Sequence, residues 1–228
     1  MAQINRPKSL TETVLEHLRE QIVSGAYELG AALSERQLAE ELNVSKTPVR
    51  ESLVQLKTEG LVTILPQRGA FVFTLSAREV IEICEFRIAI EMAALHLAIK
   101  RDRAALVADI TGVVDRMGKA RAKGDAKEYL RLDSAFHAAF FSHCGNHYLK
   151  DSYDRYVGKI AALRTHLSVK PMHTKLSFEE HKALRDVLAD GSDAQIAAIL
   201  EAHIGRTRES YAETVEDIAA ADAVKSAG

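Results

Sequence analysis

Cysteine is scarce in this chain of 228 residues, and long apolar runs are missing. Cys84 and Cys144 are sixty residues apart and form no Cys-x-x-Cys pair, which argues against a disulfide framework and a cysteine-based zinc site. No apolar run approaches the roughly twenty residues that span a bilayer, and the N-terminus MAQINRPKSL lacks the apolar core of a signal peptide. We therefore expect a cytoplasmic protein with reduced thiols and no membrane association.

The chain also lacks an excess of positive charge. Its formal net charge is −2, and residues 1–75 hold 8 lysines and arginines against 9 aspartates and glutamates. Overall charge therefore gives no support to nucleic-acid binding, although a sequence-specific binder needs only a local basic face. The length and the hydrophobic content of 47% are ordinary for a globular protein of one or two domains.

Two short helices joined by a tight turn are predicted within residues 33–53. Ser34, followed three residues later by a glutamine, has the pattern of a capping box that starts the first helix. Asn43 interrupts the apolar pattern and ends that helix, and Ser45 is the expected N-cap of the second. The apolar residues of the second helix face inward. Its outward face near the N-terminus, the part of a recognition helix that reaches base edges and phosphates, carries Lys46, Thr47 and Arg50.

A β-hairpin is predicted directly after this pair of helices. Two β-rich runs flank a turn at residues 66–69, which places Arg68 and Gly69 where a wing enters an adjacent DNA groove. A further amphipathic helix is expected over residues 10–24. This order of elements predicts a winged helix-turn-helix domain, and we assign it residues 1–75.

The segment LSERQLAEELNVSKTPVRESLVQLKTEGLV, followed by PQRGAFV, resembles the DNA-binding domain of the GntR family of bacterial transcription regulators. For Arg36 and Lys46 the alternative is solvated helix surface, but the complete motif favours contact with DNA. The resemblance implies DNA contacts by Arg36, Lys46, Thr47, Arg50 and Gly69. We add Ser45 at the helix N-terminus and Arg68 of the wing, so the expected DNA-binding residues are Arg36, Ser45, Lys46, Thr47, Arg50, Arg68 and Gly69.

The pattern changes to long helices with capping boxes from Ser76 onward, so the protein is predicted to be mainly α. We expect a second domain, residues 76–228, that is an all-α bundle of six helices. The predicted helices cover about residues 76–100, 102–123, 125–143, 147–169, 177–189, and 192 to beyond 211.

Polar residues interrupt the apolar stripes of three of these helices. Asp133 and His137 are four residues apart beside the inward face of the third helix, and His181 and His203 align with the apolar faces of the fifth and sixth. A single inward histidine is commonly a hydrogen-bonded core residue, but one aspartate and three histidines from three helices fit a metal site better. These ligands suit a divalent transition metal, Zn foremost, with Ni, Mn or Co as alternatives.

The spacing of these four residues resembles the metal-binding form of the FCD effector domain, and so does the sequence FHAAF around His137. FCD domains are the helical partners of winged helices in the FadR subfamily of GntR regulators. The six-helix length is similar to the VanR-type branch. The resemblance, which spans residues 9–214, implies a homodimer that binds a pseudo-palindromic operator and a small carboxylate effector.

Arg87 lies on the inward stripe of the first helix of this domain, with Glu91 four residues further along. One interpretation is an intrahelical ion pair between them. The other is that Arg87 binds the carboxylate of an effector through two hydrogen bonds, which is what the resemblance implies, although Ile90 replaces the commoner leucine. The other residues expected at the effector site are Tyr129, Tyr153 and Tyr156.

The sequence therefore predicts a metal-containing, ligand-responsive transcription regulator without catalytic residues, a repressor that a small organic carboxylate releases. One alternative is a regulator that senses the metal itself, against which Arg87 speaks. The other is a metalloenzyme with a DNA-binding appendage, in which three histidines and an aspartate leave a position for activated water. Against the metalloenzyme, no additional general acid or base has a convincing position. The sequence is compatible with an activator as well as with a repressor.

Overall fold

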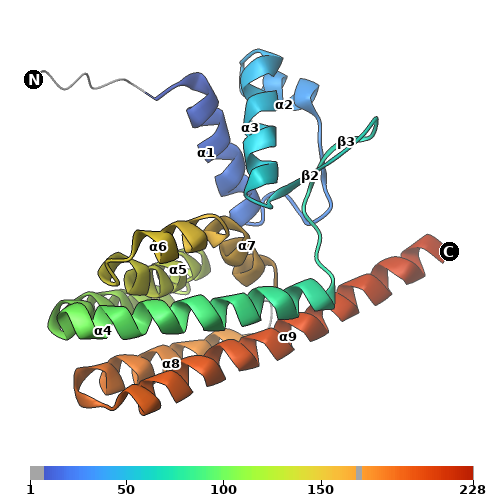
Figure 1. The fold of residues 1–228 in the computed structure, drawn as a ribbon. Coiled ribbons are helices and arrows are strands. Elements are labelled where there is room, and N and C mark those ends of the chain that lie inside the picture. The colour runs from blue at the N-terminus through green and yellow to red at the C-terminus, as the bar shows by residue number, and fades with distance from the viewer. Residues whose placement is uncertain (1–7, 168–170, 228) are drawn as a thin grey trace, which may run out of the picture. The chain divides into compact units, whose positions relative to one another are not determined.

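The computed structural model of the protein describes residues 8–167 and 171–227. The chain divides after Thr74 into two compact units. The N-terminal unit holds three helices and a small sheet, and the C-terminal unit is helical throughout its described elements (Figure 1). The prediction of a mainly α protein with a winged helix-turn-helix followed by an all-α bundle is confirmed.

The helices of the N-terminal unit are α1 (Leu10–Val23), α2 (Glu35–Glu41) and α3 (Lys46–Thr58). Ser9 starts α1 with a complete capping box, because its hydroxyl accepts from the backbone of Glu12 and the Glu12 carboxylate accepts from the backbone of Ser9. The core of the unit forms where α1 packs against α3. Its buried apolar residues include Val14, Leu18, Ile22, Val49, Leu53 and Leu56.

The sheet has three antiparallel strands in the order β1-β3-β2, namely β1 (Ala32–Leu33), β2 (Val62–Leu65) and β3 (Gly69–Val72). The predicted hairpin is present, with Leu65 opposite Gly69 across the turn. Gln67 and Gly69 have φ angles of +62° and +96°, so the turn depends on the left-handed region that glycine adopts without strain. Strand β1, only two residues long, is not predicted from the sequence.

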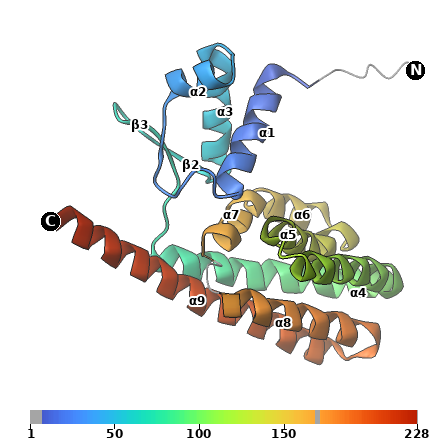
Figure 2. The same cartoon turned by 180° about the vertical axis from the view of Figure 1, so that it is seen from behind.

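The C-terminal unit consists of α4 (Ala77–Ala122), α5 (Ala126–His143), α6 (His147–Asp154), α7 (Val157–Leu167), α8 (Pro171–Asp190) and α9 (Asp193–Ala227). Helix α4 lies in the middle, with α5, α6 and α7 on one side and α8 and α9 on the other (Figure 1, Figure 2). The apolar core of the unit lies between these layers.

Helix α4 contains the break that the sequence predicts between its first two helices. Asp102 has non-helical φ and ψ angles of −157° and 85°. Its Oδ1 accepts a hydrogen bond of 2.9 Å from the backbone N–H of Ala105, so Asp102 caps the second half of α4 in the manner of a helix N-cap.

Two predicted helices differ from the structure. The fourth, expected to be continuous to Val169, is divided at Arg155 and Tyr156 into α6 and α7, because α6 packs on α4 and α5 whereas α7 packs on α5 and α9; Val169 itself lies outside the described residues. The fifth begins at Pro171 rather than at Ser177. The Ser177 hydroxyl accepts from Arg206 in α9 and does not cap a helix.

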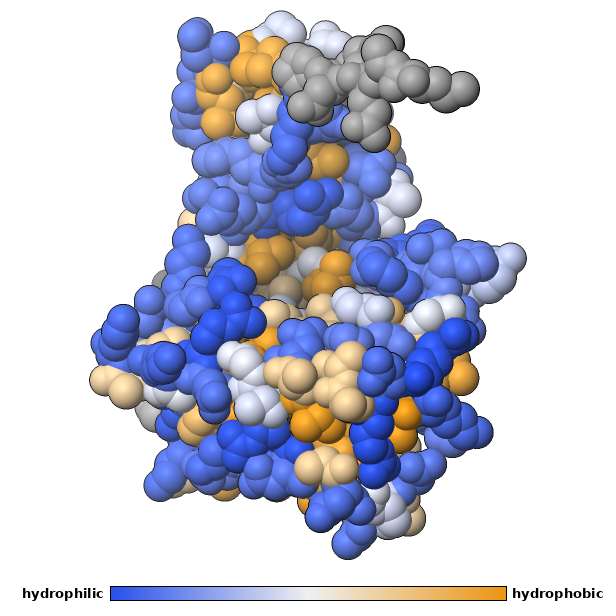
Figure 3. Space-filling model, turned by 90° about the vertical axis from the view of Figure 1, so that its left-hand side faces the viewer, coloured by the Kyte–Doolittle hydropathy of each residue, from blue (hydrophilic) through white to orange (hydrophobic). Residues whose placement is uncertain are grey.

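Polar side chains dominate the face drawn in Figure 3, where apolar residues are gathered in small groups (Figure 3). None of the helices within the described residues is long and apolar enough to cross a membrane.

Candidate functional site

Three of the predicted DNA contacts lie on the exposed face of the first turns of α3. Lys46, Thr47 and Arg50 are exposed, whereas Val49 between them is fully buried. Ser45 is the N-cap residue of α3, but its hydroxyl makes no capping hydrogen bond. This face therefore presents the hydroxyl, ammonium and guanidinium groups that contact phosphates and base edges in protein–DNA complexes.

Glu35, the first residue of α2, holds Arg50. One oxygen of Glu35, Oε2, lies 3.1 Å from Nε and 2.8 Å from Nη2 of Arg50. The hydrogen bond from Arg50 is the main reason that the pKa of Glu35 lies below its ordinary value. The pair fixes one edge of the guanidinium and leaves the other edge directed away from this ion pair.

The remaining predicted DNA contacts are also exposed. Arg36 on α2 is 3.8 Å from Glu40, a surface pair that contributes little. Arg68 and Gly69 lie at the tip of the β2–β3 hairpin. A Cβ at Gly69 would meet nothing within 4 Å, so its positive φ, not lack of space, accounts for glycine at this position.

Three of the four predicted metal ligands converge in the C-terminal unit. His137 in α5, His181 in α8 and His203 in α9 each offer a ring nitrogen, and these three atoms lie within 4.8 Å of one another. All three side chains are buried. The helices that carry them come from both sides of α4, so the cluster exists only in the folded bundle.

Carboxylates orient two of the three imidazoles. Nδ1 of His137 lies 2.6 Å from Glu91, and Nδ1 of His203 lies 2.6 Å from Glu180. Burial by itself would raise both carboxyl pKa values, but neighbouring donors and positive charges hold that of Glu91 well below its ordinary range and lower that of Glu180 to about 2. Both carboxylates are therefore ionised acceptors, and each Nδ1 donates to one of them. Burial lowers the pKa of His137 to about 4, so its Nε2 keeps its lone pair.

His181 has no such partner. Within the described part of the chain, neither of its buried ring nitrogens has a hydrogen-bond partner. Burial lowers the pKa of His181 well below its ordinary value, so the ring is neutral at pH 7. A buried imidazole with two unsatisfied nitrogens is costly unless a ligand binds it. On this observation the residues present fit a metal ion.

Asp133, the fourth predicted ligand, lies beside the histidines but is already paired. Its Oδ2 is 2.7 Å from Nε of Arg164, and its Oδ1 is 3.6 Å from Nε2 of His181. Burial would raise the pKa of Asp133, but the charge of Arg164 keeps it well below its ordinary range. Asp133 is therefore an ionised group at the edge of the cluster of three histidines.

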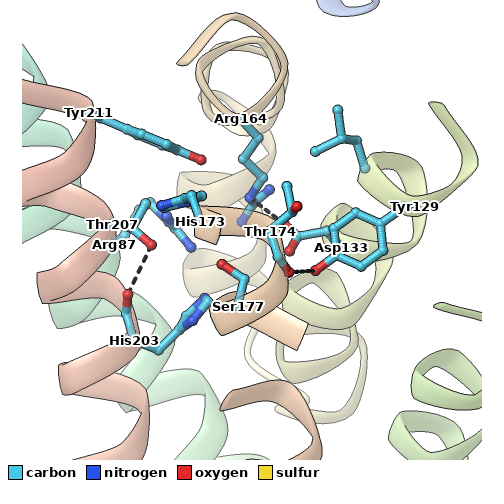
Figure 4. A pocket seen from close by; sticks show the side chains of 11 residues that line it. Arg87, Tyr129, Asp133, Arg164, His173, Thr174, Ser177, His203, Thr207 and Tyr211 are labelled. Atoms are coloured by element: carbon cyan, nitrogen blue, oxygen red, sulfur yellow. Dashed lines mark hydrogen bonds and ion pairs between the residues drawn. The ribbon is translucent and has the colours of Figure 1, made fainter. Parts of the chain in front are cut away.

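A pocket adjoins this cluster; its cavity volume is about 10 Å³, and the space reaches about 290 Å³ only when the open solvent at its mouth is included. Figure 4 shows Arg164 reaching into it and the ion pair with Asp133 on one side (Figure 4). Of the predicted effector contacts, Arg87 and Tyr129 line the pocket, whereas Tyr153 and Tyr156 are not among the described residues that do. Tyr153 is stacked on Phe141 in the core; the ring of Tyr156 packs edge-on against Phe86.

Arg87 forms the intrahelical ion pair with Glu91, one of the two roles that the sequence suggests for it. Its Nε lies 2.8 Å from Oε1 of Glu91, and both side chains are buried. Arg87 nevertheless lines the pocket, and its Nη2 is 3.5 Å from Nε2 of His137. The ion pair therefore places one guanidinium edge at the histidine cluster.

Sequence reasoning misses Arg164, the contact of Glu91 with His137 and the role of Glu180. Arg164 is 3% exposed and shares the apolar face of α7 with Leu163 and Leu167. A polar residue on an apolar stripe is the signal that identifies Arg87, and the same signal was available for Arg164. No local pattern marks the contact of Glu180 with α9.

Comparison with known proteins is consistent with this division of the chain. Residues 10–72 match the family described as bacterial regulatory proteins, gntR family, and residues 82–206 match the FCD domain. The Nta operon transcriptional regulator of Aminobacter aminovorans is 30% identical over 196 residues, which cover 85% of this chain and 90% of that protein.

A second relative and a solved structure agree. The gluconate operon transcriptional repressor of Bacillus subtilis is 33% identical over 137 residues, which cover 60% of this chain and 56% of the repressor. The structure of E. coli McbR/YncC matches with a TM-score of 0.78 at 22% identity, over 91% of this chain and 99% of that chain. The chain therefore belongs to the GntR family of bacterial regulatory proteins, with a winged helix-turn-helix DNA-binding domain and an FCD domain.

Proposed function

We propose that this DNA-binding transcription regulator contains a divalent transition metal, Zn in the first instance, and is a repressor that a small organic carboxylate releases from its operator. The observation that carries the proposal is the convergence of His137, His181 and His203 beside a pocket lined by two arginines. As a regulator of transcription it would act in the cytoplasm, where bacterial DNA lies.

The donor set supports the metal. Three imidazoles are typical ligands of Zn and neighbouring divalent ions. The pairs Glu91–His137 and Glu180–His203 have the arrangement by which carboxylates orient metal-binding histidines and fix their tautomer. When bound there, the ion supplies a Lewis-acidic centre that attracts a carboxylate oxygen. We infer that Asp133, whose Oδ1 lies 3.6 Å from Nε2 of His181, joins the three histidines as a fourth ligand.

The two arginines support the carboxylate. Arg87 and Arg164 both line the pocket, and guanidinium groups bind carboxylates through charge-assisted hydrogen bonds. Tyr129 supplies part of the apolar wall. The gluconate operon repressor, one of the relatives, is named for an operon of an organic acid, which agrees with an acid as the signal.

We infer that the regulator is a homodimer whose two α3 helices read the half-sites of a pseudo-palindromic operator. An acid that binds more tightly to the conformer whose helices do not match the half-sites lowers operator affinity by the ratio of its two affinities, and by no more. The acid would thereby induce the genes near the operator.

The first experiment is to measure metal per chain by mass spectrometry on protein purified without chelator or a nickel column. Near one transition-metal ion per chain is expected, with loss on substitution of His181 by alanine. The loaded protein is then screened with small carboxylates by thermal denaturation, where a ligand at 100 times its Kd stabilises by about 2.7 kcal/mol. A stabilising acid should also release operator DNA.

The other outcomes identify the alternatives. Protein that takes up no Zn, Ni, Mn or Co would overturn the metal site and return the histidines to the core. Operator binding that responds to metal but to no acid would indicate a metal sensor. Turnover of an added acid, rather than stoichiometric binding, would indicate a metalloenzyme.

A further inference from the structure

His173, near the start of α8, lies in the pocket in the opposite tautomer from the metal-site histidines. Its Nδ1 is 3.0 Å from Nη1 of Arg206, and a guanidinium can only donate. Nδ1 of His173 is therefore the acceptor. The ring is neutral because burial and the charge of Arg206 lower its pKa to about 4. A neutral ring whose Nδ1 accepts must carry its hydrogen on Nε2.

The partner of Nδ1 separates His173 from the histidines of the cluster. His137 and His203 donate from Nδ1 to carboxylates, as metal-binding histidines do, and the Nε2 of His137 receives only a long contact of 3.5 Å from Arg87. In His173 the lone pair is taken by Arg206 and the free position is an N–H donor. His173 is 6% exposed and lines the pocket, so this donor is available to a molecule bound there.

Arg164 supplies a second unused donor. Its Nε binds Asp133 at 2.7 Å and its Nη1 lies 3.3 Å from the hydroxyl of Ser134. Its Nη2 is buried and makes no hydrogen bond of ordinary length among the described residues, and the buried hydroxyl of the neighbouring Tyr153 makes none either. Arg164 lines the same pocket as His173 (Figure 4). A buried donor without a partner in a pocket indicates a ligand acceptor at that position.

The charges of the site indicate how many negative charges the ligand carries. The buried side chains Arg87 and Arg164 are each paired with a carboxylate, Glu91 and Asp133 respectively, so these four groups sum to zero. A divalent ion held by neutral imidazoles would add two positive charges to a buried site. Uncompensated buried charge is strongly unfavourable, and a ligand with two carboxylates restores neutrality.

We propose that the effector is a small dicarboxylate, one carboxylate of which is recognised by the Nε2–H of His173 together with Nη2 of Arg164. The inference rests on the proposed function, because it requires a metal in the histidine cluster and an acid in the pocket. It makes His173 a specificity-determining residue, which distinguishes dicarboxylates from acids with a single carboxylate.

The test compares acids of equal carbon number on the full-length, Zn-loaded protein by titration calorimetry at pH 7: propionate against malonate, and butyrate against succinate. The dicarboxylate of at least one pair should bind about 10-fold or more tightly than its partner, equivalent to about 1.4 kcal/mol. Zn retained by the protein is measured after each titration, so that chelation by the acid is not mistaken for binding.

Three variants locate the effect. His173→Leu should weaken dicarboxylate binding about 10- to 100-fold, the range for loss of a hydrogen bond to a charged group, and should weaken monocarboxylate binding by a smaller factor. His173→Gln should restore much of the affinity, because the amide N–H takes the place of Nε2–H. The control is His147→Leu, at an exposed histidine on α6 outside the pocket.

The outcomes that overturn the inference are distinct from those that overturn the proposed function. If dicarboxylates bind and His173→Leu binds them equally well, or weakens both classes equally, the role of His173 is wrong while the proposed function stands. If monocarboxylates bind as tightly as dicarboxylates, the assigned class is wrong. If the Zn-loaded wild type binds none of these acids but binds another monocarboxylate, the inference fails alone. If it binds no carboxylate, the proposed function fails.

Discussion

Arg50 is the recognition-helix residue whose loss should most weaken specific operator binding. Glu35 fixes one edge of its guanidinium, and a bidentate arginine contact to a base contributes about 1–3 kcal/mol. We expect Arg50→Ala to weaken binding to the operator by about 10-fold or more at physiological salt, measured by fluorescence anisotropy. Arg78→Ala, at an exposed arginine of α4, removes the same charge and should have no effect. Unchanged affinity of the Arg50 variant would contradict the assignment.

Glu180 should control metal affinity without being a ligand. It holds Nδ1 of His203, and loss of such a partner typically lowers metal affinity by about 10- to 100-fold. We expect this loss for Glu180→Ala, measured by competition with a chromophoric Zn chelator. The neighbouring Glu179→Ala should bind Zn like the wild type, because Glu179 is exposed and pairs with Lys182. Equal Zn affinity in both variants would mean that Glu180 supports only the fold.

At this scale the sequence predicts the individual donors but not their partners. His137, His181 and His203 follow from helical periodicity, since each interrupts an apolar stripe. The carboxylate partners of His137 and His203 come from α4 and α8. These contacts depend on how the helices pack, which periodicity does not specify. Arg87 shows the same limit, because its pairing with Glu91 is local and predictable, whereas its approach to His137 is not.

The start of α4 is an element whose stability should depend on pH. The Glu79 carboxylate accepts a 2.9 Å hydrogen bond from the backbone N–H of Ser76, and this bond is the main reason that its pKa is below the ordinary 4.5. A pKa depressed on folding stabilises the folded state above the unfolded value, and the contribution is lost as the pH falls through the folded value.

We therefore expect Glu79→Gln to lower the Tm of the FCD domain at pH 7, with a difference from wild type that shrinks as the pH falls below 4.5. Circular dichroism melts across this range measure it. Glu85→Gln removes an exposed charge elsewhere on α4 and is the control. A Tm difference that stays constant down to pH 3 would contradict the assigned cause.

Capping signals account for most of the element boundaries that could be predicted. Ser9, Ser76 and Asp125 cap α1, α4 and α5 through their side chains. Ser177 has the same local signal, but Arg206 binds its hydroxyl, so a tertiary contact overrides the cap. The division between α6 and α7 also follows from their different packing partners, which a single sequence does not reveal.

For the whole molecule, the proposed homodimer predicts a strict spacing of operator half-sites. Two recognition helices related by a twofold axis reach two half-sites on the same face of the DNA. The centres of these half-sites are separated by about one DNA turn, roughly 10 base pairs, or by a whole number of turns. An insertion of about five base pairs turns one half-site to the opposite face of the duplex. We expect this insertion to abolish tight binding in a gel-shift assay, whereas an equal-length change of spacer sequence should be tolerated. Retention of affinity would indicate monomers that bind independently.

The order of the site residues along the chain has a consequence for biosynthesis. The DNA-reading elements are complete by residue 72, but the histidine cluster needs His203, which lies in α9. During translation the residues of the winged domain are therefore all present while the chain still lacks the last histidine of the cluster. On the proposed function, a polypeptide terminated before α9 would keep the DNA-reading residues but could not assemble the site that receives the signal.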